Sequence, residues 1–254
     1  MKITRVLRTT ALLCGMSAAL LAQGRGGAPP TAKAAAPADY TGYWVSQIVD
    51  EWRFRVVPQK GDVPYMPINA DARRIANAWD PAKDEAEGNQ CKAYGAVGVM
   101  QRPGRLHITW TDDNSLQIEA DAGTQTRVLH FNGGKAAGEA TWQGYSAATW
   151  DLPRVGRGPT AGPLRGANTL KVVTTNMKPG YIRKNGVPYS ANAVLTEYFN
   201  LVTGAGSGAQ AQPYIAVTAF VEDPMYLNAP FIRTYTFKKE TDGARWEPAP
   251  CWAK

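Results

Sequence analysis

The residues best suited to acid–base chemistry are His107 and Glu119. They face each other if the surrounding chain forms a hairpin, and a carboxylate beside an imidazole orients the ring and raises its basicity. Arg127 and Gln117 would flank this pair as ligands for an anion or a hydroxyl group. The alternative interpretation, which we favour, is a solvated sheet face whose cross-strand charge pairs each stabilise the fold only slightly.

Two strands must position this pair. Residues 105–111 alternate polar and apolar side chains with period two, as a half-buried strand does. A three-residue loop at Asp112–Asn114 would set Trp110 opposite Leu116 on the apolar face and His107 opposite Glu119 on the polar face. A slip of one residue would scramble both faces, so the two kinds of pairing support the same register.

A second loop, Asp121–Gly123, continues the sheet into a third strand. With Gly in the left-handed position, the loop predicts that Gln117 lies opposite Arg127 on the polar face. His130 then falls on the apolar face, where a core histidine bonded to the backbone is a better interpretation than a ligand.

Glu197 is a carboxylate on an otherwise apolar strand face, between Leu195 and Phe199. Burial would require a partner, for which Arg183 or Arg233 is available. A structural ion pair and a ligand anchor both fit this pattern. Aromatic side chains also suit flat ligands or sugars. The predicted ligand-binding residues are Trp110, Gln117, Glu197 and Tyr198.

Residues 1–22 have the composition of a secretory signal peptide, with a basic start and an apolar run before a cleavage position after Ala22 or Gly24. The run of roughly 12 residues is too short for a membrane span, which takes about 20. Residues 23–38, rich in Gly, Ala and Pro, predict a disordered leader before a single domain over residues 39–254. We therefore expect a periplasmic or secreted protein without a transmembrane segment.

The net charge of +7 overstates the charge of that domain, because three basic residues lie within 1–22 and two more within 23–38. The remaining charge of +2 gives no electrostatic case for nucleic acid as a partner. Cys91 and Cys251 remain after the signal peptide is removed, and an oxidising compartment predicts a disulfide between them. The chain has no phosphate loop, nucleophile elbow, dinucleotide fingerprint or metal triad, so we predict no cofactor and no metal.

The remaining pattern is a series of strands at hairpin spacing with one helix inserted early. Asn69 or Asp71 caps a helix that continues through Trp79. About ten strands in an antiparallel meander must close or pair their faces, which favours an all-β barrel or a strongly curved sandwich. Besides the hairpin described above, strands are predicted over 42–49, 52–57, 97–101, 141–151, 169–175, 194–202, 214–221 and 231–238, with a turn at Asn185-Gly186.

Two features resemble the calycin barrels, the lipocalin-like group: Gly42-x-Trp44 in the first strand and Arg233 in the last. In such barrels the arginine packs on the tryptophan and closes the bottom. The chain also resembles a family of uncharacterised secreted bacterial β-barrel proteins, through Thr196-Glu197-Tyr198-Phe199, Glu222-Asp223-Pro224 and Pro230-Phe231. The resemblance implies a lipocalin-like barrel and export, and carries over no activity.

Two functional hypotheses follow. The first is a secreted or periplasmic lipocalin-like barrel that binds a small molecule in its mouth or lumen. The alternative is a cofactor-independent lyase, isomerase or hydrolase acting on a polar substrate, which requires His107, Glu119 and Arg127 to point into the lumen together. A structural module of the cell envelope is a third possibility. The sequence does not decide between an enzyme and a binding protein.

Overall fold

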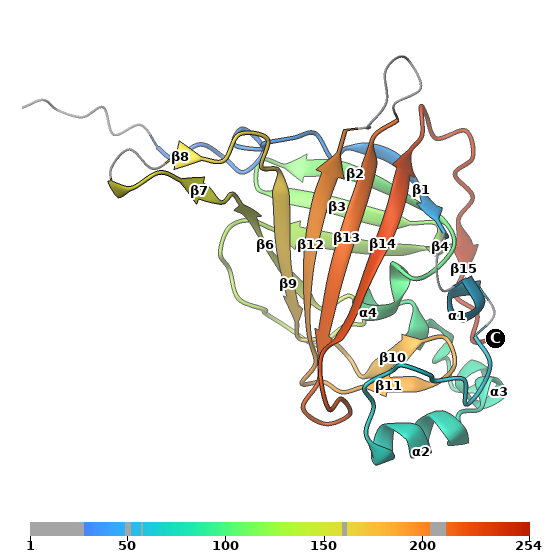
Figure 1. The fold of residues 1–254 in the computed structure, drawn as a ribbon. Helices are drawn as coiled ribbons and strands as arrows, with labels where there is room; N and C mark the ends of the chain where they lie inside the picture. The colour runs from blue at the N-terminus through green and yellow to red at the C-terminus, as the bar shows by residue number, and fades with distance from the viewer. Residues whose placement is uncertain (1–27, 49–51, 57, 159–161, 204–211) are drawn as a thin grey trace, which may run out of the picture.

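The structure, a computed structural model, describes residues 28–48, 52–56, 58–158, 162–203 and 212–254. Its main body is a closed β-barrel (Figure 1), which confirms the predicted fold class. The barrel has nine strands rather than about ten. Around the barrel these are β1 (Gly42–Gln47), β14 (Phe231–Lys239), β13 (Tyr214–Glu222), β12 (Val194–Val202), β9 (Thr169–Thr175), β6 (Tyr145–Asp151), β5 (Gln125–His130), β3 (Ser115–Ala120) and β2 (Arg105–Asp112), which pairs with β1.

One pair of neighbouring strands departs from the antiparallel meander. β5 and β6 are parallel, with Leu129 beside Ser146 and His130 beside Ala147. Parallel neighbours need a connection that returns the chain to the same end of the sheet. Residues 131–144 supply that connection. The barrel is therefore mixed rather than purely antiparallel.

Side chains alternate between the barrel interior and its outer wall, as period two requires. Along β13, for example, Ile215, Val217, Ala219 and Val221 are buried, whereas the residues between them are partly exposed. The burial of these apolar faces, at about 25 cal/mol per Å² of apolar surface, is the main force that holds the strands together.

The register of the first hairpin is as predicted, but that of the second is wrong by one residue. His107 lies opposite Glu119 and Trp110 opposite Leu116, whereas Gln117 lies opposite Val128 instead of Arg127. The loop is one residue longer than expected, because Thr124 also takes a left-handed conformation, with φ of 50°. The slip turns every β5 side chain to the other face.

The lower end of the barrel is covered by short helices and a hairpin (Figure 1). The predicted helix over 69–79 is confirmed, and Asn69 rather than Asp71 caps it. The strands predicted over 52–57 and 97–101 are wrong, since both segments contain helices; short apolar runs do not distinguish the two structures by periodicity. The elements here are α1 (Trp52–Val56), α2 (Ala70–Ala78), α3 (Pro81–Ala86), the 3-10 helix η1 (Gln90–Ala93), α4 (Ala96–Val99), β10 (Gly180–Arg183) and β11 (Val187–Tyr189).

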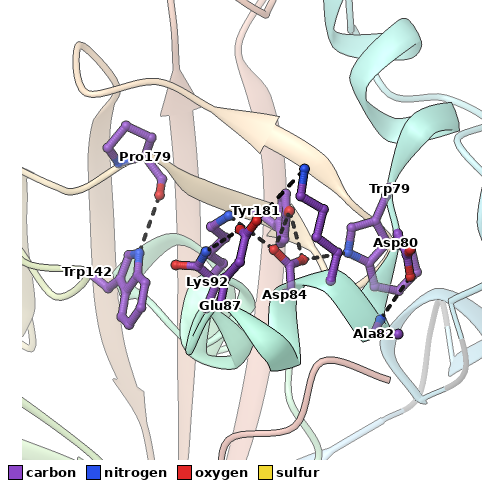
Figure 2. Close-up of polar contacts among 11 residues, drawn as sticks. Trp79, Asp80, Ala82, Asp84, Glu87, Lys92, Trp142, Pro179 and Tyr181 are labelled. Atoms are coloured by element: carbon purple, nitrogen blue, oxygen red, sulfur yellow. Dashed lines mark hydrogen bonds and ion pairs between the residues drawn. The ribbon is translucent and has the colours of Figure 1, made fainter.

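A buried carboxylate links several of these elements. Asp84 of α3 accepts hydrogen bonds from Trp79 Nε1 at 3.0 Å and from the Tyr181 hydroxyl at 2.8 Å (Figure 2). Lys92 Nζ, from η1, lies 3.0 Å from the same carboxylate. Burial, assisted by the hydrogen bond and charge of Asp84, raises the pKa of Tyr181 above its usual value.

The predicted disulfide is confirmed. Cys91 and Cys251 are bonded, with their Cα atoms 5.1 Å apart, and the bond ties the C-terminal segment to η1. In that segment β15 (Ala249–Pro250) pairs with β4 (Ala122–Gly123). Two further short strands, β7 (Arg154–Val155) and β8 (Gly162–Pro163), pair in the loop after β6.

Closure of the barrel is confirmed, but the predicted contact between Trp44 and Arg233 is wrong. Trp44 is fully buried and lies opposite Lys239, whose Nζ is 5.0 Å from the centre of the indole ring. The Arg233 guanidinium lies toward the other end of β14, 4.6 Å from the centre of the Phe231 ring. A lysine therefore takes the position over the tryptophan that the resemblance gives to an arginine.

The N-terminal segment crosses the upper end of the barrel (Figure 1, blue). The Ala32 amide donates to Asn114 Oδ1 and the Lys33 amide to the Asp113 carbonyl, both at 3.0 Å. Residues 28–38, expected to be part of a disordered leader, are therefore bonded to the barrel. The disorder was predicted from amino-acid composition, which carries no information about hydrogen bonds to distant parts of the fold. Residues 1–27, with the signal peptide and Cys14, lie outside the described residues.

Candidate ligand-binding site

Aromatic side chains gather where the N-terminal segment crosses the barrel. Trp110 at the end of β2, Phe131 and Trp150 have ring centroids 5.0–6.4 Å apart. Tyr40 stacks on Trp150 at 6.0 Å. Trp150 Nε1 donates to the Ala32 carbonyl at 2.9 Å, so the cluster also binds the N-terminal segment.

Tyr40 fixes this segment to the opposite side of the barrel. Its hydroxyl donates to the Phe199 carbonyl at 3.0 Å, and also approaches the Asn168 carbonyl. Burial raises the pKa of Tyr40 above its usual value, since the phenolate would lose its hydration. The segment is thus held at Ala32 and at Tyr40, and the residues between them form one wall of a hollow.

This rim hollow has a volume of about 690 Å³ and lies between the N-terminal segment and the start of the barrel. Trp110 contributes an aromatic surface to it, and Lys33 and Asp39 contribute charges of opposite sign. The hollow is lined by Lys33, Ala36, Ala38, Asp39, Thr41, Gly42, Ile108, Thr109 and Trp110.

Asp39 is an anion at neutral pH. Burial alone would raise the pKa of this carboxyl, but hydrogen bonds from Thr41 and the charge of Lys239 lower it below its usual value. The Thr41 amide and hydroxyl donate to Asp39 Oδ1 at 2.9 and 2.7 Å. These bonds fix the orientation of the carboxylate at the edge of the hollow.

The barrel interior holds a buried ion pair. Arg127, turned inward by the register of β5, pairs with Glu197, and both side chains are at least 97% buried. Arg127 Nε donates to Ser146 Oγ and Nη2 to Thr174 Oγ1, each at 2.8 Å. The prediction that Glu197 pairs with Arg183 or Arg233 is wrong. The predicted register had placed Arg127 on the outer face, so Arg127 was not considered as a partner.

Two atoms of this pair, Arg127 Nη1 and Glu197 Oε1, are buried and form no hydrogen bond within the ranges that the structure describes. Buried polar groups nearly always have partners, so each such atom calls for a water molecule or a ligand group.

The predicted acid–base pair lies on the outer wall. His107 Nδ1 is 2.9 Å from Glu119 Oε2, and Tyr43 stacks on the imidazole with ring centroids 4.2 Å apart. The side chains of His107 and Glu119 are 25% and 35% exposed. Arg127 points into the barrel, so the structure brings together two of the three residues that the enzyme hypothesis requires and separates the third from them.

The predicted ligand-binding residues are also distributed over several places. Trp110 lines the rim hollow and Glu197 lies inside the barrel, whereas Gln117 and Tyr198 lie on its outer wall. Sequence reasoning missed Lys33 and Asp39, because Lys33 lies within a Gly/Ala/Pro-rich stretch that has no periodic signal and Asp39 directly follows it. Asp39 before Thr41 is the one local signal, since Asp commonly accepts from the backbone two residues on.

Among the described residues, no helix has the length and apolar character of a membrane span, and no three acidic, His or Cys side chains are grouped to hold a metal ion. Comparison with protein-family models, with curated proteins and with solved structures finds no match to this chain.

Proposed function

We propose that this protein is an exported, lipocalin-like barrel that binds a small molecule in the rim hollow. The observation that carries the proposal is the hollow itself. Its volume of about 690 Å³ lies within the range of about 300–1,000 Å³ that is typical of small-molecule sites. It also joins an aromatic wall to a few polar groups, which is the usual composition of such a site.

The lining favours a flat apolar ligand with a charged end. Trp110 offers a face for stacking, the Asp39 carboxylate suits an ammonium group, and Lys33 suits a carboxylate. An aromatic zwitterion would satisfy both charges. The Cys91–Cys251 disulfide supports export, since such bonds persist in oxidising compartments.

A panel of aromatic amines, aromatic carboxylates and aromatic amino acids tests the proposal by tryptophan fluorescence and melting temperature. We expect a compound that quenches fluorescence and raises the melting temperature. The fluorescence change should be lost in Trp110→Phe and kept in Trp52→Phe, which removes a tryptophan that is 63% exposed and does not line the rim hollow.

Charge-neutral variants identify the polar contacts. Asp39→Asn should weaken the binding of amines, and Lys33→Gln should weaken the binding of carboxylates. Each affinity should fall by roughly tenfold at most, because a partly exposed charge pair contributes about 1 kcal/mol or less. A ligand whose binding and fluorescence change are the same in Trp110→Phe as in the unaltered protein would place the site elsewhere and contradict the proposal.

A further inference from the structure

A second polar region lies near the lower end of the barrel, away from the rim hollow. Three arginines are buried there: Arg55 of α1, Arg102 after α4, and Arg183 of β10, with exposed fractions of 3%, 5% and 1%. Burial of a cation is unfavourable unless a partner replaces its water. The partners of each guanidinium therefore indicate what the region does.

Arg55 and Arg183 have identifiable surroundings. Arg55 donates to the Gln47 carbonyl at 3.2 Å and to Ser46 Oγ at 2.9 Å. The Arg183 guanidinium lies 4.5 Å from the centre of the Phe54 ring. Both side chains are thereby held in place, and both contribute positive charge beside Arg102.

Arg102 differs from them. Its Nε and Nη2 atoms are buried and have no hydrogen-bond partner within the described part of the chain. Burial first, and then the charges of Arg55 and Arg183, lower the pKa of Arg102 to about 10, while Tyr94 and Tyr235 act in the opposite direction. Arg102 is thus still a cation at neutral pH, and its two unpartnered donors lie on the same edge of the guanidinium. A carboxylate or phosphate group pairs with such an edge through two parallel hydrogen bonds.

Arg102 lines a surface hollow of about 300 Å³, to which α1, β4 and β15 also contribute residues. Arg55 and Lys184 line the same hollow, and Tyr94 and Trp252 give it aromatic surfaces. Lys184 Nζ is held 5.4 Å from the centre of the Tyr94 ring and 5.8 Å from that of Trp252. The hollow therefore combines cations with flat apolar walls.

Acidic groups also face this hollow, but part of their charge is already engaged. Asp121 is buried, accepts the Arg105 amide at 2.7 Å, and has its pKa raised chiefly by burial. Arg105 is paired with Glu240 at 2.8 Å. Glu247 is the other acidic residue of the lining. Apart from Arg105, whose charge is paired with Glu240, the lining holds three cationic side chains and two carboxyl groups. The cations are those of Arg55, Arg102 and Lys184, and the carboxyl groups are those of Asp121 and Glu247.

We propose that this hollow binds a small organic anion through its carboxylate or phosphate group, with Arg102 as the primary ligand and Lys184 as a second cation. The aromatic walls take a flat body attached to that group. This site is independent of the rim hollow, so either one can be tested without the other.

Titration calorimetry of the intact protein with inorganic phosphate, sulfate, benzoate and phenyl phosphate tests the site. Benzoate and phenyl phosphate distinguish the two head groups, and inorganic phosphate shows what the head group contributes alone. We expect millimolar or tighter binding of at least one aromatic anion, and weaker binding of the head group without its ring.

The matched variants are Arg102→Met and Arg73→Gln, the second of which removes the same charge from an exposed position on α2. Arg102→Met should weaken the affinity for the anion about tenfold to a hundredfold, as expected for the loss of hydrogen bonds to a charged group. Arg73→Gln should leave the affinity unchanged. If Arg102→Met does not fold, Lys184→Gln carries the test with an expected weakening of about twofold to fivefold.

Three results would overturn the proposal. The first is that none of the four anions binds at millimolar concentration, which would mean that water alone satisfies Arg102. The second is equal binding by Arg102→Met and Arg73→Gln. The third is binding by Lys184→Gln as tight as that of the unaltered protein.

Discussion

Asp84 and Glu197 are both buried carboxylates with a cationic partner, yet their surroundings satisfy them to different extents. Asp84, among the helices of the lower end, accepts from Trp79, Lys92 and Tyr181 (Figure 2). Glu197, inside the barrel, binds Arg127 through Oε2, while its Oε1 has no partner among the described residues.

The two groups are carried by different kinds of element. The donors to Asp84 come from a helix end, a 3-10 helix and a hairpin strand, and together they satisfy both carboxylate oxygens. Glu197 and Arg127 stand on barrel strands whose positions the backbone ladder fixes. A polar atom left over there cannot recruit a new neighbour. Glu197 Oε1, buried without a partner among the described residues, therefore marks a place for water or ligand, whereas Asp84, with both oxygens bonded, is structural.

Glu197→Ala should have the largest effect on stability. Among the described residues, it leaves the buried Arg127 guanidinium with the Ser146 and Thr174 hydroxyl groups as its remaining acceptors. Breaking one side of a buried pair costs about 3–5 kcal/mol, which urea denaturation would measure. The double variant Arg127→Met/Glu197→Leu should recover most of this loss, because it removes both charges and keeps the volume.

The outer-wall pair of His107 and Glu119 provides the matched control. Glu119→Ala breaks a partly exposed carboxylate contact of similar geometry, and should change the free energy of unfolding by about 1 kcal/mol or less. If Glu197→Ala costs no more than Glu119→Ala, then water reaches the interior pair and the contrast with the outer wall is wrong.

Asp84→Ala should have an intermediate effect. Trp79 and Tyr181 lose their acceptor, but Lys92 is one-quarter exposed and can turn toward water. We expect a loss of about 2 kcal/mol in urea denaturation. Glu87→Ala, which removes an exposed i,i+4 partner of Lys83 at the C-cap of α3, should cost about 0.5 kcal/mol or less. Equal losses for the two variants would show that the Asp84 hydrogen bonds do not matter for stability.

The sequence predicted the barrel because strand alternation is a local property. The strands over 169–175 and 194–202 were predicted with the bounds observed, and the face on which Glu197 lies was correct. The partner of Glu197 could not be predicted, because one additional left-handed residue, Thr124, turned Arg127 inward. A residue of this type rarely adopts positive φ, so neither residue type nor periodicity reveals it.

The helical lower end and the rim hollow were beyond sequence reasoning for a different reason. The contacts of Asp84 join residues up to 97 positions apart, and those of the N-terminal segment join Ala32 to Trp150. Contacts of this kind depend on tertiary packing rather than on local pattern. The Arg102 hollow is assembled in the same way from segments distant in the sequence.

Tyr181→Phe should destabilise the protein less than Glu197→Ala or Asp84→Ala, and it tests the Asp84 cluster through pH. At neutral pH the variant loses one hydrogen bond to Asp84, which still accepts from Trp79 and Lys92, so we expect a cost of about 1 kcal/mol. Because the pKa of Tyr181 is raised in the folded protein, the unfolded chain ionises this phenol first. Its contribution to stability is therefore complete below about pH 10 and is lost as the pH rises beyond that value.

Urea denaturation of both proteins between pH 7 and pH 11 measures the difference in their free energies of unfolding. This gap should narrow above pH 10, because the other buried tyrosines contribute equally to each protein. Tyr198→Phe, on the outer wall, should show no such narrowing. A gap between Tyr181→Phe and the unaltered protein that stays constant to pH 11 would mean that the hydroxyl is solvated, and that Asp84 is less completely satisfied by the protein than its contacts indicate.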